Sequence, residues 1–407
     1  GDRQLQSTNY EKLRKTVLNL GVFFTIISQM PFLRVRLQID TQSIAYPIWI
    51  LMFFVTVIAT VRIRIHEIVF PMSVFSIFIV AMLLFEMISD NEYISSVLVM
   101  PIIISIMMLI IGYLNADLFT PDFIKKIAAV YIFATFLMCV DIYFEYLRGY
   151  DFGRVIYVYR SKNSAGQLIV TALVQQIFMF KPSGIKRLVK YGVIAFLLLV
   201  IVLMRSRASI VSLIFIPITY VFNRHVKTRS KLLVILALIV AILITVFNET
   251  VYDFAIRNLL LNSPDKRSIG FSDLNRISSH RYSYFETFAT LFPGNELIGI
   301  GSYYMDNFYM EVILNYGIFI GLIIIALALF PLKVAFSFKN SNIESILAIR
   351  IIALSYAFNG IFEGLAPFGP GAKCFFLWLI VGVLLNRSGR SSAHSDGYIL
   401  THTNVSQ

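Results

Sequence analysis

Long apolar runs alternate with short polar connections along almost the whole chain, and this pattern predicts an all-α polytopic membrane protein. A run of about 20 apolar residues is long enough to span a bilayer as a helix. We expect about twelve membrane helices, at approximately 15–33, 44–61, 68–87, 95–114, 127–145, 164–180, 191–204, 208–222, 232–248, 306–330, 343–362 and 372–386. Residues 1–387 should therefore form a single polytopic membrane domain with both termini on one side.

Two stretches do not fit this pattern. The connection 249–305 is long and not hydrophobic, and a loop of this length usually has a function or a structure of its own. We expect it to be a large external loop whose short helices cap a site. Residues 388–407 are polar and lack periodicity, so we expect a disordered tail or a cloning remnant that does not belong to the fold.

Composition supports the membrane assignment. Hydrophobic residues make up 58% of the chain and charged residues only 14%, whereas soluble domains have roughly a quarter charged residues. The net charge of +12 does not indicate a nucleic-acid partner, because a membrane protein needs basic cytoplasmic loops. Cys139 and Cys374 lie in apolar runs without disulfide or metal spacing, which is typical of small core residues. No paired histidines or D-x-D motif suggest a metal site.

The distribution of charge predicts the sidedness. Short basic loops at Arg62/Arg64, Lys125/Lys126, Lys181–Lys190 and Arg224–Lys231 should be cytoplasmic. The acidic loop Ser89–Glu92 suits the outside. Both termini are then cytoplasmic, and the loop 249–305 lies outside. The two basic flanks of 191–222 require a hairpin that turns at Arg205–Arg207, with arms too short to reach the outer surface.

Arginine is preferred over lysine on the predicted outer side. That side carries eleven arginines and three lysines, whereas the inner side carries nine arginines and eleven lysines. Arginine binds phosphate oxygens bidentately and keeps its charge when desolvated, which lysine does less well. Anchoring to outer-leaflet headgroups is the alternative for Arg34 and Arg36. The outer side is thus predicted to hold phosphate.

Three outer clusters could carry the chemistry. Arginines among tyrosines in 148–163 suit a phosphate beside sugar rings, although an interfacial aromatic belt would look similar. Arg205 and Arg207 at membrane depth are expected to line a cavity or substrate path, and structural pairing with a carboxylate is the alternative. The loop 249–305 contributes Arg276, His280 and Arg281 before an aromatic helix that serves packing more readily than sugar binding.

Four outer residues are candidates for acid–base chemistry. They are His280, Asp306, Glu311 and Glu363. Histidine is the usual side chain that titrates near neutral pH, but a single surface histidine is more often a bystander than a base.

Three stretches resemble the O-antigen polymerase/ligase superfamily of bacterial membrane glycosyltransferases, more specifically its Wzy-type polymerases. Arg160-Ser-Lys-Asn-Ser-Ala-Gly166 resembles the family's entry into a helix after an arginine-bearing outer loop. Arg205-Ser-Arg207-Ala resembles its S-R-small hairpin. Arg281, followed by Gly299-Ile-Gly301, Asp306-Asn307, Asn315 and Gly317, resembles its R…G-x-G…HN…G segment. The resemblance covers roughly 150–390 and is carried by the order and sidedness of short motifs.

This resemblance implies a GT-C-like helical fold in the bacterial inner membrane with its active site on the periplasmic face. Donor and acceptor would both be undecaprenyl diphosphate-linked oligosaccharides, and no cofactor is expected. Partners would be membrane lipids and a chain-length regulator. The site residues expected on this basis fall into three groups: diphosphate-binding Arg160, Arg205, Arg207, Arg276 and Arg281; catalytic His280, Arg281 and Asp306; and sugar-binding Tyr157, Tyr159, Asn163, Asn307 and Glu311.

Two other functions stay open from the sequence. An O-antigen ligase would transfer glycan to lipid A-core, but ligases of the superfamily carry histidine where this chain has Asp306, which favours a polymerase. A transporter that flips lipid-linked oligosaccharide also suits twelve helices. A carrier would need basic residues accessible from both sides, whereas the candidate arginines are predicted only in the outer half.

Overall fold

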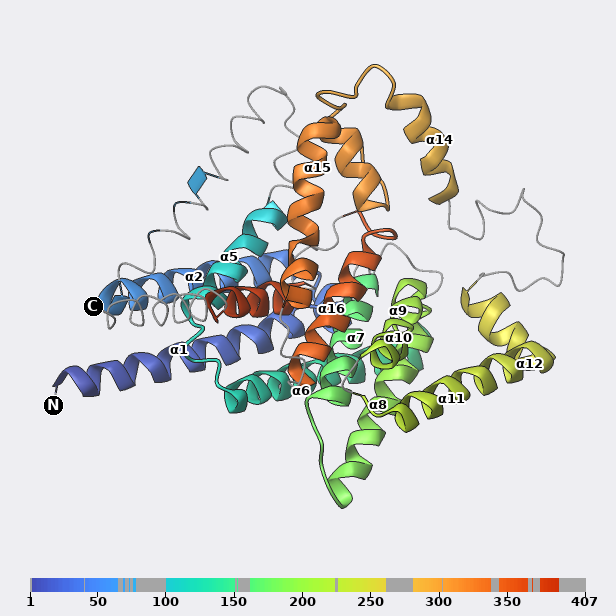
Figure 1. Cartoon of the computed structure of the whole chain (residues 1–407), viewed down its shortest axis with the longest axis horizontal. Helices are drawn as coiled ribbons and strands as arrows, with labels where there is room; N and C mark the ends of the chain where they lie inside the picture. The colour runs from blue at the N-terminus through green and yellow to red at the C-terminus, as the bar shows by residue number, and fades with distance from the viewer. Residues whose placement is uncertain are drawn as a thin grey trace, which may run out of the picture.

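The computed structural model describes residues 2–39, 41–64, 100–150, 152, 162–223, 226–260, 281–301, 303–337, 344–364, 368 and 374–387, with single positions at 69, 73, 76 and 77. Every regular element within these ranges is a helix (Figure 1). Four are long and apolar enough to cross a membrane: Pro121–Leu147, Ile185–Met204, Thr228–Phe247 and Phe308–Ser337. Five shorter apolar helices accompany them: Ile44–Ala59, Met100–Leu114, Arg207–Phe222, Ile346–Asn359 and Phe375–Arg387.

The predicted all-helical, apolar architecture is thus confirmed for the described part of the chain. Each expected span except 68–87, which lies almost wholly outside the described residues, overlaps a helix. The number of membrane crossings stays a prediction.

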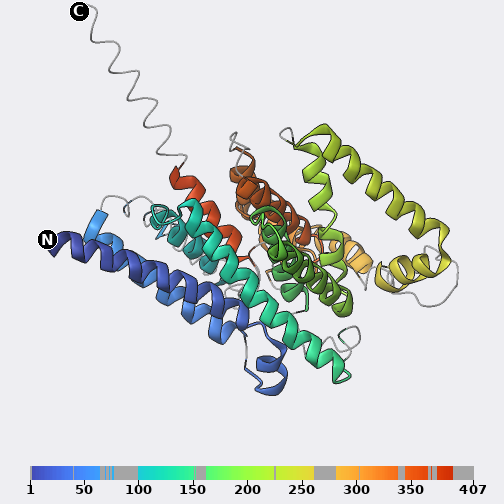
Figure 2. The same cartoon turned by 90° about the horizontal axis from the view of Figure 1, so that it is seen from below.

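The N-terminal part is a layer of long helices that lie side by side (Figures 1 and 2). It contains α1 (Asp2–Ile27), the π-helix η1 (Phe32–Arg36), α2 (Thr41–Arg64), α5 (Met100–Leu114) and α6 (Pro121–Leu147). α1 packs against both α2 and α6, and α2 packs against α5. α6 begins sharply because the Thr120 side chain accepts the N–H of Phe123 and Pro121 occupies the first helical position.

An inner helix, α7 (Lys162–Phe178), joins this layer to the rest. Thirteen of its seventeen residues are buried, and it packs against α6, α8 (Ile185–Met204), α9 (Arg207–Ser212) and α16 (Glu344–Asn359). Such all-round burial is typical of a core helix.

One face of α7 is nevertheless polar, with Asn163, Gln167, Thr171 and Gln175 at four-residue intervals. The Gln167 amide donates to the Ser355 hydroxyl at 3.0 Å, and the hydroxyls of Thr171 and Tyr356 lie 2.7 Å apart. Hydrogen bonds of this kind fix one apolar helix against another.

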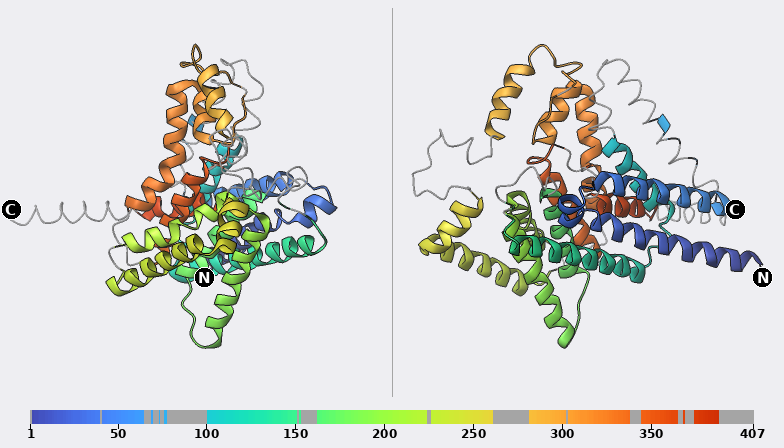
Figure 3. Two further views of the ribbon diagram at one scale, coloured as in Figure 1. Left: turned by 90° about the vertical axis from the view of Figure 1, so that its right-hand side faces the viewer. Right: turned by 180° about the vertical axis from the view of Figure 1, so that it is seen from behind.

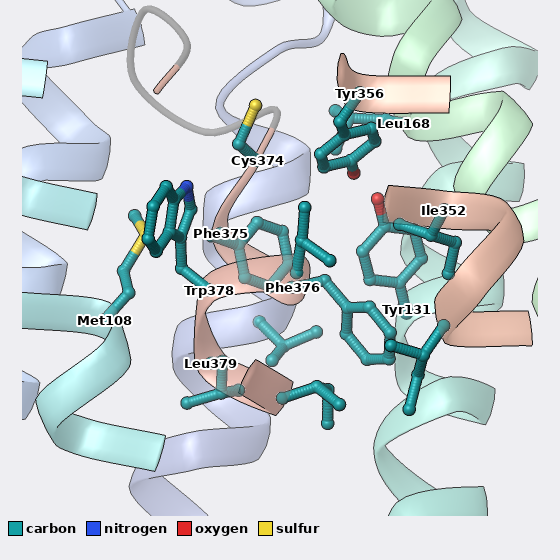
Figure 4. Close-up of a cluster of buried hydrophobic side chains, with 14 of the residues drawn as sticks. Met108, Tyr131, Leu168, Ile352, Tyr356, Cys374, Phe375, Phe376, Trp378 and Leu379 are labelled. Atoms are coloured by element: carbon teal, nitrogen blue, oxygen red, sulfur yellow. The ribbon is translucent and has the colours of Figure 1, made fainter. Parts of the chain in front are cut away.

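Aromatic side chains fill the core between α5, α6, α16 and the final helix, Phe375–Arg387 (Figure 4). The ring of Tyr131 lies 5.5 Å from that of Phe375 and 5.4 Å from that of Phe376. These separations are typical of favourable aromatic pairs. Cys139 and Cys374 are both buried, and neither forms a disulfide bond, as their apolar surroundings in the sequence predict.

The expected hairpin at Arg205–Arg207 is present. α8 ends at Met204, Arg205 adopts a left-handed conformation with a φ of 51°, and α9 starts at Arg207. The start of α8 and the end of α10 (Phe215–Phe222) line the same cavity, so the chain does fold back. α9 and α10 are separate helices because Pro217 cannot donate the hydrogen bond that would join them.

α11 (Thr228–Phe247) stands away from the bundle (Figures 2 and 3) and has no buried residue. A helix this apolar that buries none of its residues is suited to lipid and not to water. The connection that follows contains α12 (Glu249–Tyr252), η3 (Asp253–Leu260) and α14 (Arg281–Leu291). These short helices match the secondary structure expected within 249–305.

α15 (Phe308–Ser337) differs from the single straight helix expected at 306–330. Gly317 has a φ of 73°, and the helix breaks there. A Cβ on Gly321 would lie 3.0 Å from the Cα of Ile313, although residues eight apart in a straight helix are about 12 Å apart. The chain therefore folds back at Gly317. In Figure 1, α15 accordingly consists of two arms that meet at one end.

Candidate functional site

Five segments that are distant in sequence meet at the N-terminal end of α7. They are the first turn of α7, the turn at 205–207 between α8 and α9, the start of α14, residues 303–311 and residues 360–364 after α16. All five belong to the side that the sequence assigns to the outside. The structure therefore gathers the predicted outer ends in one place.

Asn163 connects three of these segments. Its amide nitrogen donates to the carboxylate of Glu363, and its amide oxygen accepts the Ser206 hydroxyl at 3.3 Å. Gly166, one turn later, allows this approach, because a Cβ there would overlap the Ser209 hydroxyl. Glu363 is half-buried and Ser206 fully buried, so these bonds are made away from bulk water.

Arg281 is held by two groups. Its Nη2 donates to the carbonyl of Phe362 at 3.0 Å and lies 3.6 Å from the carboxylate of Asp306. The Tyr304 hydroxyl donates to the same carboxylate at 2.8 Å. The side chains of Arg281 and Asp306 are 22% and 32% exposed, so the pair stays accessible to a ligand.

Arg207 brings a second guanidinium group close to the first. It is half-buried, and its charge interacts unfavourably with that of Arg281. Two guanidinium groups at one partly desolvated site are well suited to bind the oxygens of an anion. Arg205, two residues away, is exposed.

Residues 297–301 make close backbone contacts with 314–317. Gly299 and Gly301 both have a φ of 79°, a conformation that favours glycine. A Cβ on Gly299 would overlap the backbone of Asn315, and a Cβ on Gly317 would overlap that of Leu297. The G-x-G motif and Gly317 therefore form one interface, in which the loop packs against the backbone of α15 at its break.

Asn315 extends this interface toward the site. Its side chain accepts the N–H of Tyr303 at 2.9 Å and donates to the carbonyl of Tyr303 at 2.7 Å. These two bonds fix the backbone directly before Tyr304 and Asp306. The glycines and Asn315 thus position the acidic partner of Arg281.

Asn307 and Glu311, the two residues expected to bind sugar from this segment, both accept hydrogen bonds from the protein backbone. The Asn307 side chain accepts the N–H of Met310 at 3.1 Å and caps α15. Glu311 is only 2% exposed, and its carboxylate accepts the N–H of Met305 at 3.2 Å. A Cβ on Gly364 would overlap this carboxylate. Glu311 therefore faces the protein interior beneath the site.

Two tyrosines beside Asp306 remain protonated. The pKa of Tyr284 and that of Tyr304 are both raised, first by desolvation and then by the negative charge of Asp306. Both phenols can therefore donate hydrogen bonds at neutral pH.

Several outer arginines have structural partners instead of a shared ligand site. Arg36 and Arg148 lie 3.1 Å and 2.6 Å from the carboxylate of Glu145, which is 1% exposed. Arg257 pairs with Asp253 at 2.7 Å. A buried carboxylate needs such compensation. Part of the arginine preference therefore has a structural cause, and for Arg36 that cause is an ion pair with the protein.

Five predicted site residues lie outside the described part of the chain: Tyr157, Tyr159, Arg160, Arg276 and His280. Three further residues lie at the site but were not predicted as site residues from the sequence: Ser206, Tyr284 and Tyr304. Ser206 stands between Arg205 and Arg207, and only the two arginines were predicted to bind a ligand. Glu363 was considered only for acid–base chemistry, and its contact with Asn163, 200 positions away, has no signal in a single sequence.

No group of three or more His, Cys, Asp and Glu side chains within the described ranges could hold a metal ion. No protein-family model matches the chain, and neither does any curated protein.

Proposed function

We propose that the chain is a membrane glycosyltransferase that polymerises lipid-linked oligosaccharide repeat units. The observation that carries this proposal is the hydrogen-bonded network through Asn163, which brings the turn before Arg207 and the segment that holds Arg281 to the same end of an inner helix. Two arginine forks at one site suit the oxygens of a diphosphate. The resemblance of 150–390 to the Wzy-type polymerases supplies the substrate class.

The proposed reaction joins two undecaprenyl diphosphate-linked glycans. A hydroxyl oxygen at the non-reducing end of the acceptor attacks the anomeric carbon of the donor glycan. The bond from that carbon to the diphosphate breaks, and its electron pair leaves with the diphosphate oxygen. Arg207 and Arg281 stabilise the negative charge that develops on this oxygen. Because diphosphate is already a good leaving group, stabilising this charge is the main task of the site.

A carboxylate near the arginines accepts the hydroxyl proton. Asp306 is engaged by Arg281 and Tyr304, so its main role is to orient Arg281. Glu363, whose carboxylate accepts the amide of Asn163, is the second carboxylate at the site and the candidate for the base. His280 and Arg276 stay candidates from the sequence, as does the contribution of Arg160.

The wider proposal includes about twelve spans in a GT-C-like arrangement, cytoplasmic termini and a periplasmic site in the bacterial inner membrane. A chain-length regulator is the expected partner. Asp306, in place of the ligase histidine, favours a polymerase over a ligase.

The test uses the purified full chain in detergent with a lipid-linked repeat unit as its only substrate. A polymerase gives a ladder of products, and Arg281→Ala removes the ladder while the protein still purifies as a folded monomer or oligomer. A single transfer that needs lipid A-core would instead identify a ligase. Absence of product together with translocation in vesicles would identify a transporter and overturn the proposal.

A further inference from the structure

A cavity of about 770 Å³ lies at the opposite end of α7 from the candidate site. Its walls come from the end of α7, the start of α8, the end of α10, the start of α11 and Leu347 of α16. Fifteen residues of α7 separate Asn163 from Phe178, which corresponds to about 22 Å along the helix. The cavity is therefore separate from the arginine site.

The charge of this cavity has one sign. Lys181, Lys190 and Lys227 line it, and no Asp or Glu is among its described lining residues. A neighbouring cavity of about 380 Å³ shares Lys181 and Lys190, adds Lys125 and Lys186, and likewise has no acidic residue in its described lining. Lysines gathered without carboxylates attract an anion, and basic pockets between membrane helices are suited to lipid headgroups.

One lysine is held in place by the end of α7. The ammonium group of Lys190 donates to the carbonyl of Ile177 at 3.0 Å and to that of Phe180 at 2.7 Å. These bonds satisfy carbonyls that the helix end would leave unpaired. They also fix the position of one positive charge in the cavity wall.

The remaining walls are apolar. Ile194, Ile216, Pro217 and Val234 line the cavity, and the rest of α11 exposes apolar side chains on all sides. A ligand that matches both features has an anionic head and a hydrocarbon chain. α11 contributes one wall of the cavity, and its exposed apolar surface suits the hydrocarbon of a bilayer.

We propose that this cavity, the lysine pocket, binds an anionic phospholipid. The phosphate lies among Lys181, Lys190 and Lys227, and an acyl chain lies against Ile216, Pro217 and Val234. This assignment does not depend on the transferase reaction, because it uses none of the residues at the other end of α7.

The test measures lipid binding to the purified full chain in a neutral detergent by native mass spectrometry. The probes are dioleoyl phosphatidylglycerol and dioleoyl phosphatidylcholine, which share their acyl chains and differ in net charge. Preferential binding of phosphatidylglycerol is expected, and Lys181→Gln with Lys227→Gln should weaken it about ten- to thirty-fold. The matched control, Arg229→Gln with Lys231→Gln, removes the same charge from the first turns of α11 outside the pocket lining and should leave the preference intact.

A second variant tests the apolar half while every lysine stays in place. Ile216→Trp fills the cavity and should weaken phosphatidylglycerol binding without changing the weak attraction of inorganic phosphate. Equal binding of the two lipids would overturn the proposal, as would equal losses in the lysine variant and its control. Inorganic phosphate that displaces the lipid at comparable concentration would show an anion site without a lipid chain and would also overturn it.

Discussion

The two ends of α7 carry positive charge in different ways. At the N-terminal end, Arg207 and Arg281 lie among Asp306, Glu363 and a network of directed hydrogen bonds. At the C-terminal end, lysines line an open cavity whose described lining has no carboxylate. Arginines that pair with carboxylates are held in a fixed orientation. A cavity lined only by positive charges attracts an anion and leaves volume for it.

The two proposed functions divide along the helix in the same way. A transfer reaction requires orientation within about an ångström, and at the N-terminal end Arg281 has fixed partners in Phe362 and Asp306. A lipid requires volume and positive charge, which the cavity at the C-terminal end provides. The polar face of α7 connects the two ends through Gln167 and Thr171, which keep the helix rigidly bonded to α16.

The largest effect is expected from Arg281→Ala. Removing one group that stabilises developing charge lowers transfer rates by about 10²- to 10³-fold, and we expect this loss in the rate of ladder formation.

Two arginine variants serve as controls for Arg281→Ala. Arg257→Ala removes an arginine from the same connection, 249–305, and Arg229→Ala removes one near the C-terminal end of α7. Both should form near wild-type ladders. A comparable loss in either would mean that net charge, and not the site, supports transfer.

Glu363→Gln should come next. A positioned base contributes about 10²-fold or more, and the amide keeps the shape of the side chain and one polar atom near Asn163. The single-turnover rate should fall by about that factor, while the affinity for the lipid-linked substrate stays unchanged. A wild-type single-turnover rate would remove Glu363 from the reaction and return Asp306 and His280 to consideration.

A glycine pair tests whether the loop interface positions the site. Gly299→Ala and Gly294→Ala both place alanine at a φ between 79° and 89°, a conformation that costs about 1–2 kcal/mol. Only at Gly299 would the Cβ also overlap the backbone of Asn315, because Gly294 has nothing within 4 Å. Overpacking adds about 1–3 kcal/mol, so Gly299→Ala should unfold at a lower temperature than Gly294→Ala. Equal melting temperatures in detergent would refute the interface.

Asp306→Asn should have the smallest effect if Asp306 only orients Arg281. An ion pair with this exposure contributes about 1 kcal/mol or less, which corresponds to a loss of about five-fold in rate. The measurement is the initial rate of ladder formation. A fall of 10²-fold or more would instead assign Asp306 as the base.

Much of the helical arrangement could be predicted, because apolar runs and basic loops can be recognised from neighbouring residues in the sequence alone. The turn at Arg205–Arg207 followed from two basic flanks that both needed the same side of the membrane. The break at Gly317 did not follow, because the apolar pattern of α15 is continuous across it. Its cause is the packing of Leu297 and Gly299 against the backbone of 315–317, which is a tertiary contact.

The site was predictable only in outline. Residue type and sidedness selected Arg207 and Arg281, and the structure brings their charges together. The same criterion also selected Arg36 and Arg148, whose partner is Glu145 on α6. A single sequence cannot distinguish an arginine that binds a ligand from one that neutralises a buried carboxylate. The pairing depends on which helices pack side by side.

In the proposed site, Arg207 and Arg281 bind the same diphosphate. Binding of farnesyl diphosphate to the purified chain tests it directly, with Arg207→Gln, Arg281→Gln and the double variant compared in one cycle. Each single change should weaken binding about ten-fold or more, and the double variant should lose less than the sum of both changes, because residues that share a partner are coupled. Wild-type affinity in either single variant, or strictly additive losses, would contradict the shared site.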